Sequence, residues 1–311
     1  MKGVNKTTIE WVKNPDGSQG YTLSPITGCQ NACRNYCYAR KLALTRLKNS
    51  YLHGNNIVAP IPQITRAAAE ADPFHPRFWK ERVETLHQLA GVKKRMGVFL
   101  CDMGEIAGPW VPVDWLMDIF DGIETARQHR FYILSKCYNS HVVLNYPRNV
   151  WVGFSVTTQA QYKMVMELCR LYQDDYSDRI RFLSVEPFLE DIDMDADELK
   201  AAGIKWVIAG ALSGTKKTLE TIMVKTDKDS HTALRLRHWH GTKMVLVPKI
   251  EWLAKVGAAT KKAGIPLFCK PELEAMPLKD IINLRVMKLL DIDPEKNLCF
   301  PQVMPGEKIN V

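Results

Sequence analysis

The sequence has no hydrophobic run that approaches the about 20 residues needed to span a bilayer. Its first residues, MKGVNKTTIEW, contain neither the apolar core of a signal peptide nor a myristoylation pattern. Internal repeats and low-complexity tracts are also missing. We therefore expect a cytoplasmic protein with no membrane partner.

Acidic residues are less common than basic ones. The sequence has 34 Asp and Glu and 42 Lys and Arg, which gives a formal net charge of +8. A basic surface raises the encounter rate with phosphates, so this balance favours a polyanionic partner, although enzymes of small anions are often equally basic. The 311 residues suffice for one large core or for two ordinary domains.

The eight cysteines are not expected to form a disulfide framework in a reducing compartment. Three of them, Cys29, Cys33 and Cys37, are spaced by four residues. The remaining five are scattered and fit small buried hydrophobic residues: Cys101, Cys137, Cys169, Cys269 and Cys299.

Apolar, strand-like runs alternate with helical patterns along the chain. The runs lie near 19–25 and at 97–101, 130–135, 150–156, 180–187, 205–210 and 265–270. Segments 112–129 and 160–173 have apolar residues at helical spacing. This alternation predicts an α/β fold with parallel strands, as a full or partial (β/α) barrel, with a doubly wound open sheet as the alternative.

Active sites of both folds lie at the carboxyl ends of the strands. In this chain those ends are polar, glycine-containing or charged, which indicates the lining of a site. They are 101–105, 135–139, 155–159, 185–187, 210–214 and 269–272.

The three closely spaced cysteines need a loop in order to act together. A continuous helix would separate Cys29 from Cys37 by about 12 Å, and the preceding SPITG supplies a break. A structural zinc site would need a distant fourth ligand such as His53. Three unrelated core cysteines are a further alternative. An iron–sulfur cluster with one open iron explains three ligands directly and is the favoured interpretation.

The cysteine segment, which closes in Cys-Tyr-Ala, resembles the radical S-adenosylmethionine (SAM) superfamily, whose usual spacing is Cys-x3-Cys-x2-Cys rather than the Cys-x3-Cys-x3-Cys found here. The later motifs resemble the phage Gp37/Gp68-like family (DUF5131). They follow in the family's order over roughly residues 8–272, with Leu212 where the family tends to have an acidic residue: NPDGSQGYTLSPITGC, CDMGE, YILSK, NVWVGFSV, RFLSVEP, WVIAGALSG and PLFCK.

This resemblance implies a [4Fe–4S] cluster held by Cys29, Cys33 and Cys37, with SAM bound at the open iron. The residues expected to contact the cofactors are Tyr36, Tyr38, Glu105, Ser155, Thr157 and Glu186. Those expected at the reacting centre are Cys101, Lys136, Glu186 and Lys270, with Cys101, Cys137 and Cys269 as candidate hydrogen-atom donors. The plainer alternatives are loop packing for the tyrosines, helix capping for Ser155 and Thr157, and surface or ion-pair roles for the charged groups.

Segment 215–249 interrupts the alternation and contains eight Lys or Arg against three acidic residues. Such a segment suits contact with a nucleic-acid backbone and bases, and a solvated or oligomer-forming excursion is the alternative. The candidate nucleic-acid-binding residues are Lys216, Lys217, Arg235, Arg237, Trp239 and Lys243.

Together these features predict a radical SAM domain over residues 1–274, which includes the basic segment, and a C-terminal extension over 275–311 that packs on it. We expect a radical SAM enzyme that acts on a nucleobase or base-attached substituent in DNA or a nucleotide. An isomerase for phage or bacterial DNA hypermodification is the leading form, and a photoproduct-lyase-like enzyme is an alternative. Further alternatives are a non-catalytic zinc- or cluster-stabilised nucleic-acid-binding protein and a radical SAM enzyme of a free metabolite. An external flavodoxin- or ferredoxin-type electron donor would be required.

Overall fold

The computed structural model describes residues 1, 3–31, 33, 36–53, 64–138, 146–172, 179–225, 234–238, 243–276, 284–290 and 302–306. Its tertiary contacts divide the chain into two compact units, Met1–Gly153 and Phe154–Val311. The structure contains a mostly parallel sheet of eight strands. No helix of the described ranges is both long and apolar enough to cross a membrane.

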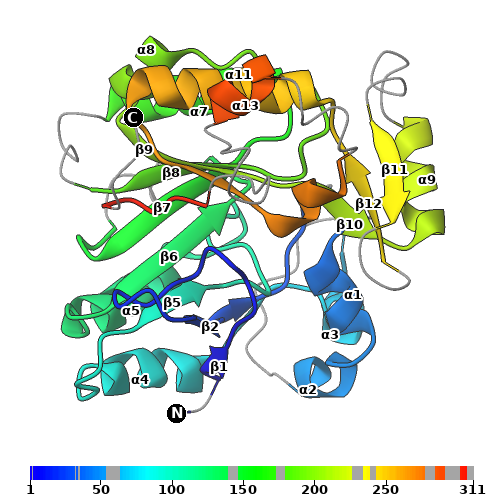
Figure 1. Ribbon diagram of the computed structural model, residues 1–311. Helices are drawn as coiled ribbons and strands as arrows, with labels where there is room; N and C mark the ends of the chain where they lie inside the picture. Colours follow the sequence, from blue (N-terminus) through cyan, green and yellow to red (C-terminus); the bar gives the residue numbers. More distant parts are fainter. Residues whose placement is uncertain are drawn as a thin grey trace. The chain divides into compact units, whose positions relative to one another are not determined.

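In the first unit, β1 pairs antiparallel with β2, and the order β2, β5, β6 is parallel. These strands span Asn5–Lys6, Tyr21–Leu23, Gly97–Leu100 and Arg130–Ser135. Helices α4 (Lys80–Leu89) and α5 (Val113–Thr125) pack on each other (Figure 1). The remaining elements are β3 Ile26–Thr27, β4 Arg77–Phe78, α1 Tyr38–Leu44, α2 Lys48–Leu52 and α3 Arg66–Ala71.

Strand β7 (Val150–Ser155) contains the division between the units. In the second unit, β8 (Arg181–Val185), β9 (Ile204–Ala209) and β13 (Leu267–Cys269) are parallel neighbours in that order. The other elements are α7 Gln159–Leu171, α8 Ala196–Ala201, α11 Ile250–Ala263, the 3-10 helix η3 Pro271–Ala275 and α13 Leu284–Leu290.

The predicted α/β fold with parallel strands is confirmed, and its sheet is open rather than closed into a full barrel among the described residues. The sheet order runs from β1 to β13 without closing among the described residues, as in a partial barrel. The strands are apolar because they are buried: Val98, Phe131, Ile133, Phe182 and Val207 are all fully inaccessible to solvent.

The basic segment does interrupt the βα alternation. After β9 the chain forms β10 (Leu212–Gly214), α9 (Lys216–Lys225), β11 (Arg235–His238) and β12 (Met244–Val247). The three strands form a separate antiparallel sheet in the order β10, β12, β11, and α9 packs on it (Figure 1).

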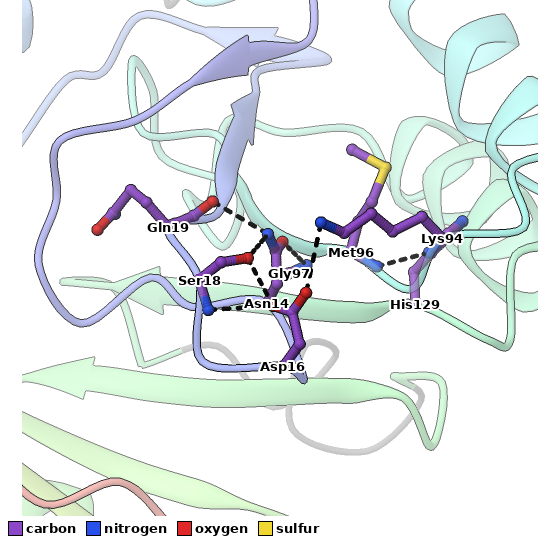
Figure 2. Close-up of polar contacts among 8 residues, drawn as sticks. All are labelled: Asn14, Asp16, Ser18, Gln19, Lys94, Met96, Gly97 and His129. Atoms are coloured by element: carbon purple, nitrogen blue, oxygen red, sulfur yellow. Dashed lines mark hydrogen bonds and ion pairs between the residues drawn. The ribbon is translucent and has the colours of Figure 1, made fainter.

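The turn formed by residues 14–18 packs against the amino end of β5 (Figure 2). The buried side chain of Asn14 accepts a hydrogen bond from the Gly97 N–H at 2.8 Å and donates to Ser18 Oγ and to the Gln19 carbonyl. A Cβ atom on Gly97 would lie 2.0 Å from the Lys13 carbonyl oxygen. This close backbone contact gives the NPDG stretch a structural role.

Candidate functional site

The cysteine loop begins at a tight backbone contact in the first unit. Gly28 pairs with Gly104 in an isolated parallel bridge, donating to the Met103 carbonyl at 2.9 Å and accepting from the Glu105 N–H at 3.2 Å. Gly28 has φ of 86°, and a Cβ there would lie 2.5 Å from the His75 carbonyl oxygen. Glycine is therefore required at this position. The contact places the first cysteine beside the loop that follows β5.

The three predicted thiols lie near one another. Cys33 donates a hydrogen bond to Cys37, and this bond lowers the pKa of Cys37 to about 6 and raises that of Cys33. Cys37 is also the N-cap of α1 and accepts from the Arg40 N–H at 3.4 Å. Burial raises the pKa of Cys29 to about 12, and the charge of Cys37 adds to this shift. Helix α1 starts only after Cys37.

Glu105 organises the carboxyl ends of β5 and β6. Its buried carboxylate accepts hydrogen bonds from the Ala107 N–H at 3.1 Å, Ser135 Oγ at 2.7 Å and the Lys136 N–H at 2.9 Å. Burial raises the pKa of this carboxyl, while these donors and the Lys136 ammonium lower it. The ammonium also lowers the pKa values of Cys33 and Cys37, so its charge acts on the thiols and on Glu105.

Two residues that sequence reasoning did not assign to this group join the loop to those strand ends. The Asn31 N–H donates to Cys29 Sγ at 3.3 Å, and its side-chain amide donates to Glu105 at 3.3 Å. The Cys137 thiol donates to the amide oxygen of Asn31 at 3.2 Å. Cys137 was expected only as a candidate hydrogen-atom donor at a strand end. Its contact with Asn31 depends on the folded loop and has no signal in the local sequence.

The two tyrosines that flank Cys37 have different surroundings. Burial, together with the charges of Cys33 and Cys37, raises the pKa of Tyr36 to about 12, which puts its ring beside the thiols. Tyr38 is 53% exposed, and its hydroxyl donates to the Asp102 carbonyl at 2.7 Å. Tyr38 therefore connects the start of α1 to the loop after β5 through this hydrogen bond.

Cys101 ends β5 in an unusual backbone conformation. It is the one non-glycine residue with positive φ in the described ranges, at 58°, and its side chain is 4% exposed. Such a conformation costs of order 1 kcal/mol or more and is concentrated at functional sites. Burial raises the pKa of this thiol to about 12, so it stays protonated at neutral pH.

Among the described residues, no three His, Cys, Asp or Glu side chains are arranged to hold a metal ion. A structural zinc site needs ligands around one atom. A four-iron cluster is wider, and its cysteine ligands bind separate irons. Three half-buried thiols under the positive charge of Lys136 are a donor set that fits an anionic thiolate cluster.

In the second unit, Glu186 and Lys270 form an ion-pair group together with Glu272. Lys270 Nζ lies 2.5 Å from Glu186 Oε1 and 3.0 Å from Glu272 Oε1. Gly210 provides the space, because a Cβ there would lie 2.9 Å from Lys270 Cδ and 3.2 Å from Glu186. The three charges follow β8 and β13, at the predicted strand ends. Glu272 lies in the predicted strand end 269–272 but was not named as a site residue, and it is part of η3.

Ser155 and Thr157, at the carboxyl end of β7, are buried. Thr157 donates from its hydroxyl to Gln161 Oε1 at 2.9 Å, and Thr158 caps α7 by accepting from the Gln161 N–H. Ser155 is 2% exposed. The N-cap of α7 is Thr158 rather than Ser155 or Thr157, and the cofactor contacts of Ser155 and Thr157 stay predictions.

Five of the six predicted nucleic-acid-binding residues lie on α9, β11 and the residue before β12. Lys216, Lys217, Arg235 and Lys243 are exposed, and Arg237 is partly buried. Trp239 lies outside the described residues, as does Cys299.

Solved structures of spore photoproduct lyase have a similar fold. The C140S mutant has a TM-score of 0.50 and 11% sequence identity, with 85% of this chain and 80% of that chain covered. The enzyme complexed with dinucleoside spore photoproduct has a TM-score of 0.51 at the same identity and coverage. At this identity the similarity shows the fold. No curated protein matches the chain.

A family model described as protein of unknown function (DUF5131) matches residues 6–225, well over half of the sequence. The phage Gp37/Gp68-like name for this group stays a prediction. The matched range contains the thiol loop and Glu105, as well as Cys101 and Glu186. The chain therefore belongs to the DUF5131 family.

Proposed function

We propose that the protein is a radical SAM enzyme that acts on a nucleobase or on a base-attached substituent. The observation that carries the proposal is the group of Cys29, Cys33 and Cys37 beside buried Glu105 and the Lys136 ammonium. These groups come from the loop after β3 and from the ends of β5 and β6. In a partial barrel, strand ends are where chemistry is expected.

The three thiols would hold a [4Fe–4S] cluster, with S-adenosylmethionine at the open iron. When bound, the cluster would supply the electron that cleaves S-adenosylmethionine to a 5′-deoxyadenosyl radical for hydrogen abstraction. The protein's own contribution is electrostatic and geometric. Lys136 favours the thiolate forms of Cys33 and Cys37, and Glu105 offers a fixed, buried acceptor for a cationic group of the cofactor.

Cys101 is the proposed hydrogen-atom donor. Its S–H bond would break as a C–H bond forms on the substrate radical. The resulting thiyl radical would be reduced by one electron from the external flavodoxin- or ferredoxin-type donor and would take a proton from water. Burial supports this role, because it keeps the thiol protonated. Lys136, Glu186 and Lys270 are proposed to hold anionic or hydrogen-bonding groups of the bound molecules.

A nucleic-acid substrate is supported by the net charge of +8 and by the basic small sheet. Two reaction types remain within the proposal. A rearrangement in phage or bacterial DNA hypermodification would make the enzyme an isomerase. A lyase reaction on a base lesion is favoured by the similar fold of the lyase complexed with dinucleoside spore photoproduct. A cytoplasmic location also stays a prediction.

Anaerobic reconstitution with iron and sulfide, followed by reduction in the presence of S-adenosylmethionine, tests the proposal. We expect about four irons per chain for a single cluster and formation of 5′-deoxyadenosine. Cys33→Ala should lose both. Cys169→Ala removes a buried thiol of α7 outside the site and is the matched control that should keep both. Cys101→Ala should keep the cluster and cofactor cleavage and lose product formation.

Tight zinc binding by the wild type without cofactor cleavage would reject the proposal in favour of a zinc-stabilised binding protein. Retention of iron and cleavage by Cys33→Ala would reject the ligand assignment. Turnover of a free metabolite, with no binding to oligonucleotides, would reject the nucleic-acid substrate.

A further inference from the structure

Asn31 follows the first cysteine of the loop by two residues and contacts it through the backbone. The Asn31 N–H donates to Cys29 Sγ at 3.3 Å. Because this bond spans so short a piece of chain, its geometry depends on how the peptide group of Asn31 is oriented. A side chain that is held in place on other elements would fix that orientation.

Both ends of the Asn31 amide are bound at the carboxyl ends of β5 and β6. The amide nitrogen donates to Glu105 at 3.3 Å, and the amide oxygen accepts from the Cys137 thiol at 3.2 Å. This orientation of the amide satisfies both partners, because an ionised carboxylate only accepts hydrogen bonds and a thiol can donate one. The side chain of Asn31 is therefore held at two points.

The two partners of the amide are themselves fixed by the end of β6. Glu105 accepts from Ser135 Oγ at 2.7 Å and from the Lys136 N–H at 2.9 Å. The Cys137 N–H donates to the same Ser135 Oγ at 2.9 Å. Asn31 is thus attached to a support that belongs to the sheet, and the thiol loop takes its position from that support.

The surroundings of Asn31 strengthen these bonds. Asn31, Cys29 and Cys137 are half-buried, and Glu105 is fully buried. A hydrogen bond in such a place has little competition from water and a low local dielectric constant. Bonds to charged groups contribute about 1.5 to 3 kcal/mol. The bond to Glu105 is of this kind, and the bond to Cys29 becomes so when the sulfur is a thiolate.

We propose that Asn31 is a positioning residue that holds its own N–H on Cys29 Sγ and thereby raises the reduction potential of the cluster that the three thiols would bind. This inference rests on the proposed function and adds a residue and a property of the same site. Reduction adds negative charge to the cluster and its sulfur ligands, so a fixed N–H donor stabilises the reduced form more than the oxidised form.

Two other charges act on the same sulfur atoms. The Glu105 carboxylate acts on Cys29, and the Lys136 ammonium acts on Cys33 and Cys37. Substitution of Asn31 by an uncharged residue leaves both charges in the protein. A change in potential then reports the hydrogen bonds of Asn31 rather than the loss of a charge.

The test is a redox titration of the reconstituted full chain without S-adenosylmethionine, followed by the electron paramagnetic resonance signal of the reduced cluster. Asn31→Leu keeps a side chain of similar size and removes both amide bonds. We expect the ratio of reduced to oxidised cluster at a given potential to fall about tenfold, which is a midpoint about 59 mV lower for a one-electron couple. Asn49→Leu, the same change on the exposed surface of α2, is the matched control and should keep the wild-type midpoint.

Asn31→Ala should lower the midpoint in the same direction, and it keeps the test valid if leucine does not fit. A wild-type midpoint in both Asn31 variants would overturn the inference. Loss of iron from both variants would also overturn it, because Asn31 would then be needed to build the site rather than to set its potential. A wild type that binds no cluster would reject the proposed function, whereas unchanged midpoints in variants that carry the cluster reject this inference alone.

Discussion

His129 joins two backbone segments through both ring nitrogens. Its Nδ1 accepts from the Met96 N–H at 3.0 Å, and its Nε2 donates to the Leu89 carbonyl at 2.8 Å. Since Nδ1 must accept, the ring has to be neutral with its proton on Nε2. Protonation of Nδ1 would break the bond that leads into β5. Burial lowers the pKa of His129 below its usual 6.5.

This geometry predicts a pH-dependent stability. The pKa is lower in the folded state, so the contribution is complete above the unfolded value of about 6.5 and is lost as the pH falls below it. Chemical denaturation of the wild type should show a decrease in the free energy of unfolding from pH 7.5 to pH 5. His129→Gln should be less stable at pH 7.5 and show a weaker decrease. An identical pH dependence in both proteins would contradict the assignment.

Residue roles were predictable where the sequence keeps the partners close together. The thiol loop follows from the spacing of Cys29, Cys33 and Cys37, and the ends of the apolar strands indicated Glu105 and Lys270. The contacts of Asn31 with Cys137 and Glu105 were not predictable, because the partners are 106 and 74 residues apart in the chain. Such pairs form only when the parallel strands bring their ends together.

Arg181 connects the carboxyl ends of two helices to the start of β8. Its buried guanidinium donates to the carbonyls of Cys169 at 2.7 Å, Tyr172 at 2.6 Å and Ala202 at 3.4 Å. The last carbonyls of a helix lack partners within the helix and carry partial negative charge. A single planar cation thus satisfies the ends of α7 and α8.

We expect Arg181→Lys to destabilise the protein by about 3 kcal/mol, because an ammonium cannot reach carbonyls on both helices and buried acceptors stay unpaired. Urea denaturation measures the effect. Arg170→Lys, on the exposed surface of α7, is the control and should change the free energy of unfolding by less than about 0.5 kcal/mol. A similarly small effect of Arg181→Lys would show that the three bonds do not stabilise the helix ends.

At the level of elements, long apolar strands and amphipathic helices were predicted well. Segment 130–135 is β6 as expected, and 112–129 and 160–173 correspond to α5 and α7 with shorter carboxyl ends. The small antiparallel sheet was recognised only as an interruption. Its strands have three or four residues, too few for their periodicity to separate them from loops.

The C-terminal segment is part of the packing of the second unit. Helix α13 lies against α11, where a Cβ on Gly257 would be 2.7 Å from Leu290. Farther along, Val303 accepts from the indole N–H of buried Trp206 at 3.0 Å and donates to the Leu267 carbonyl at 3.1 Å. The predicted division into a domain over 1–274 and an extension over 275–311 that packs on it stays a prediction.

A chain that ends at residue 276 should therefore be less stable than the full chain. Removal of α13 exposes one side of α11, and the Trp206 N–H loses its acceptor, which alone costs about 1 to 3 kcal/mol. Trp206→Phe in the full chain removes the indole N–H, so that the Val303 carbonyl loses its donor while α13 stays in place. Thermal unfolding should rank the full chain above Trp206→Phe, and Trp206→Phe above the truncated chain. Equal melting temperatures for the full and truncated chains would contradict the packing role.

The contact between Gly28 and Gly104 has a consequence for the evolution of the family. It fixes Cys29 through the backbone, and the start of α1 fixes Cys37 separately. We therefore expect that one additional residue before the last cysteine leaves the positions of Cys29 and Cys37 unchanged. Homologues of this chain should be sought by the two glycines, with the spacing of the cysteines allowed to vary.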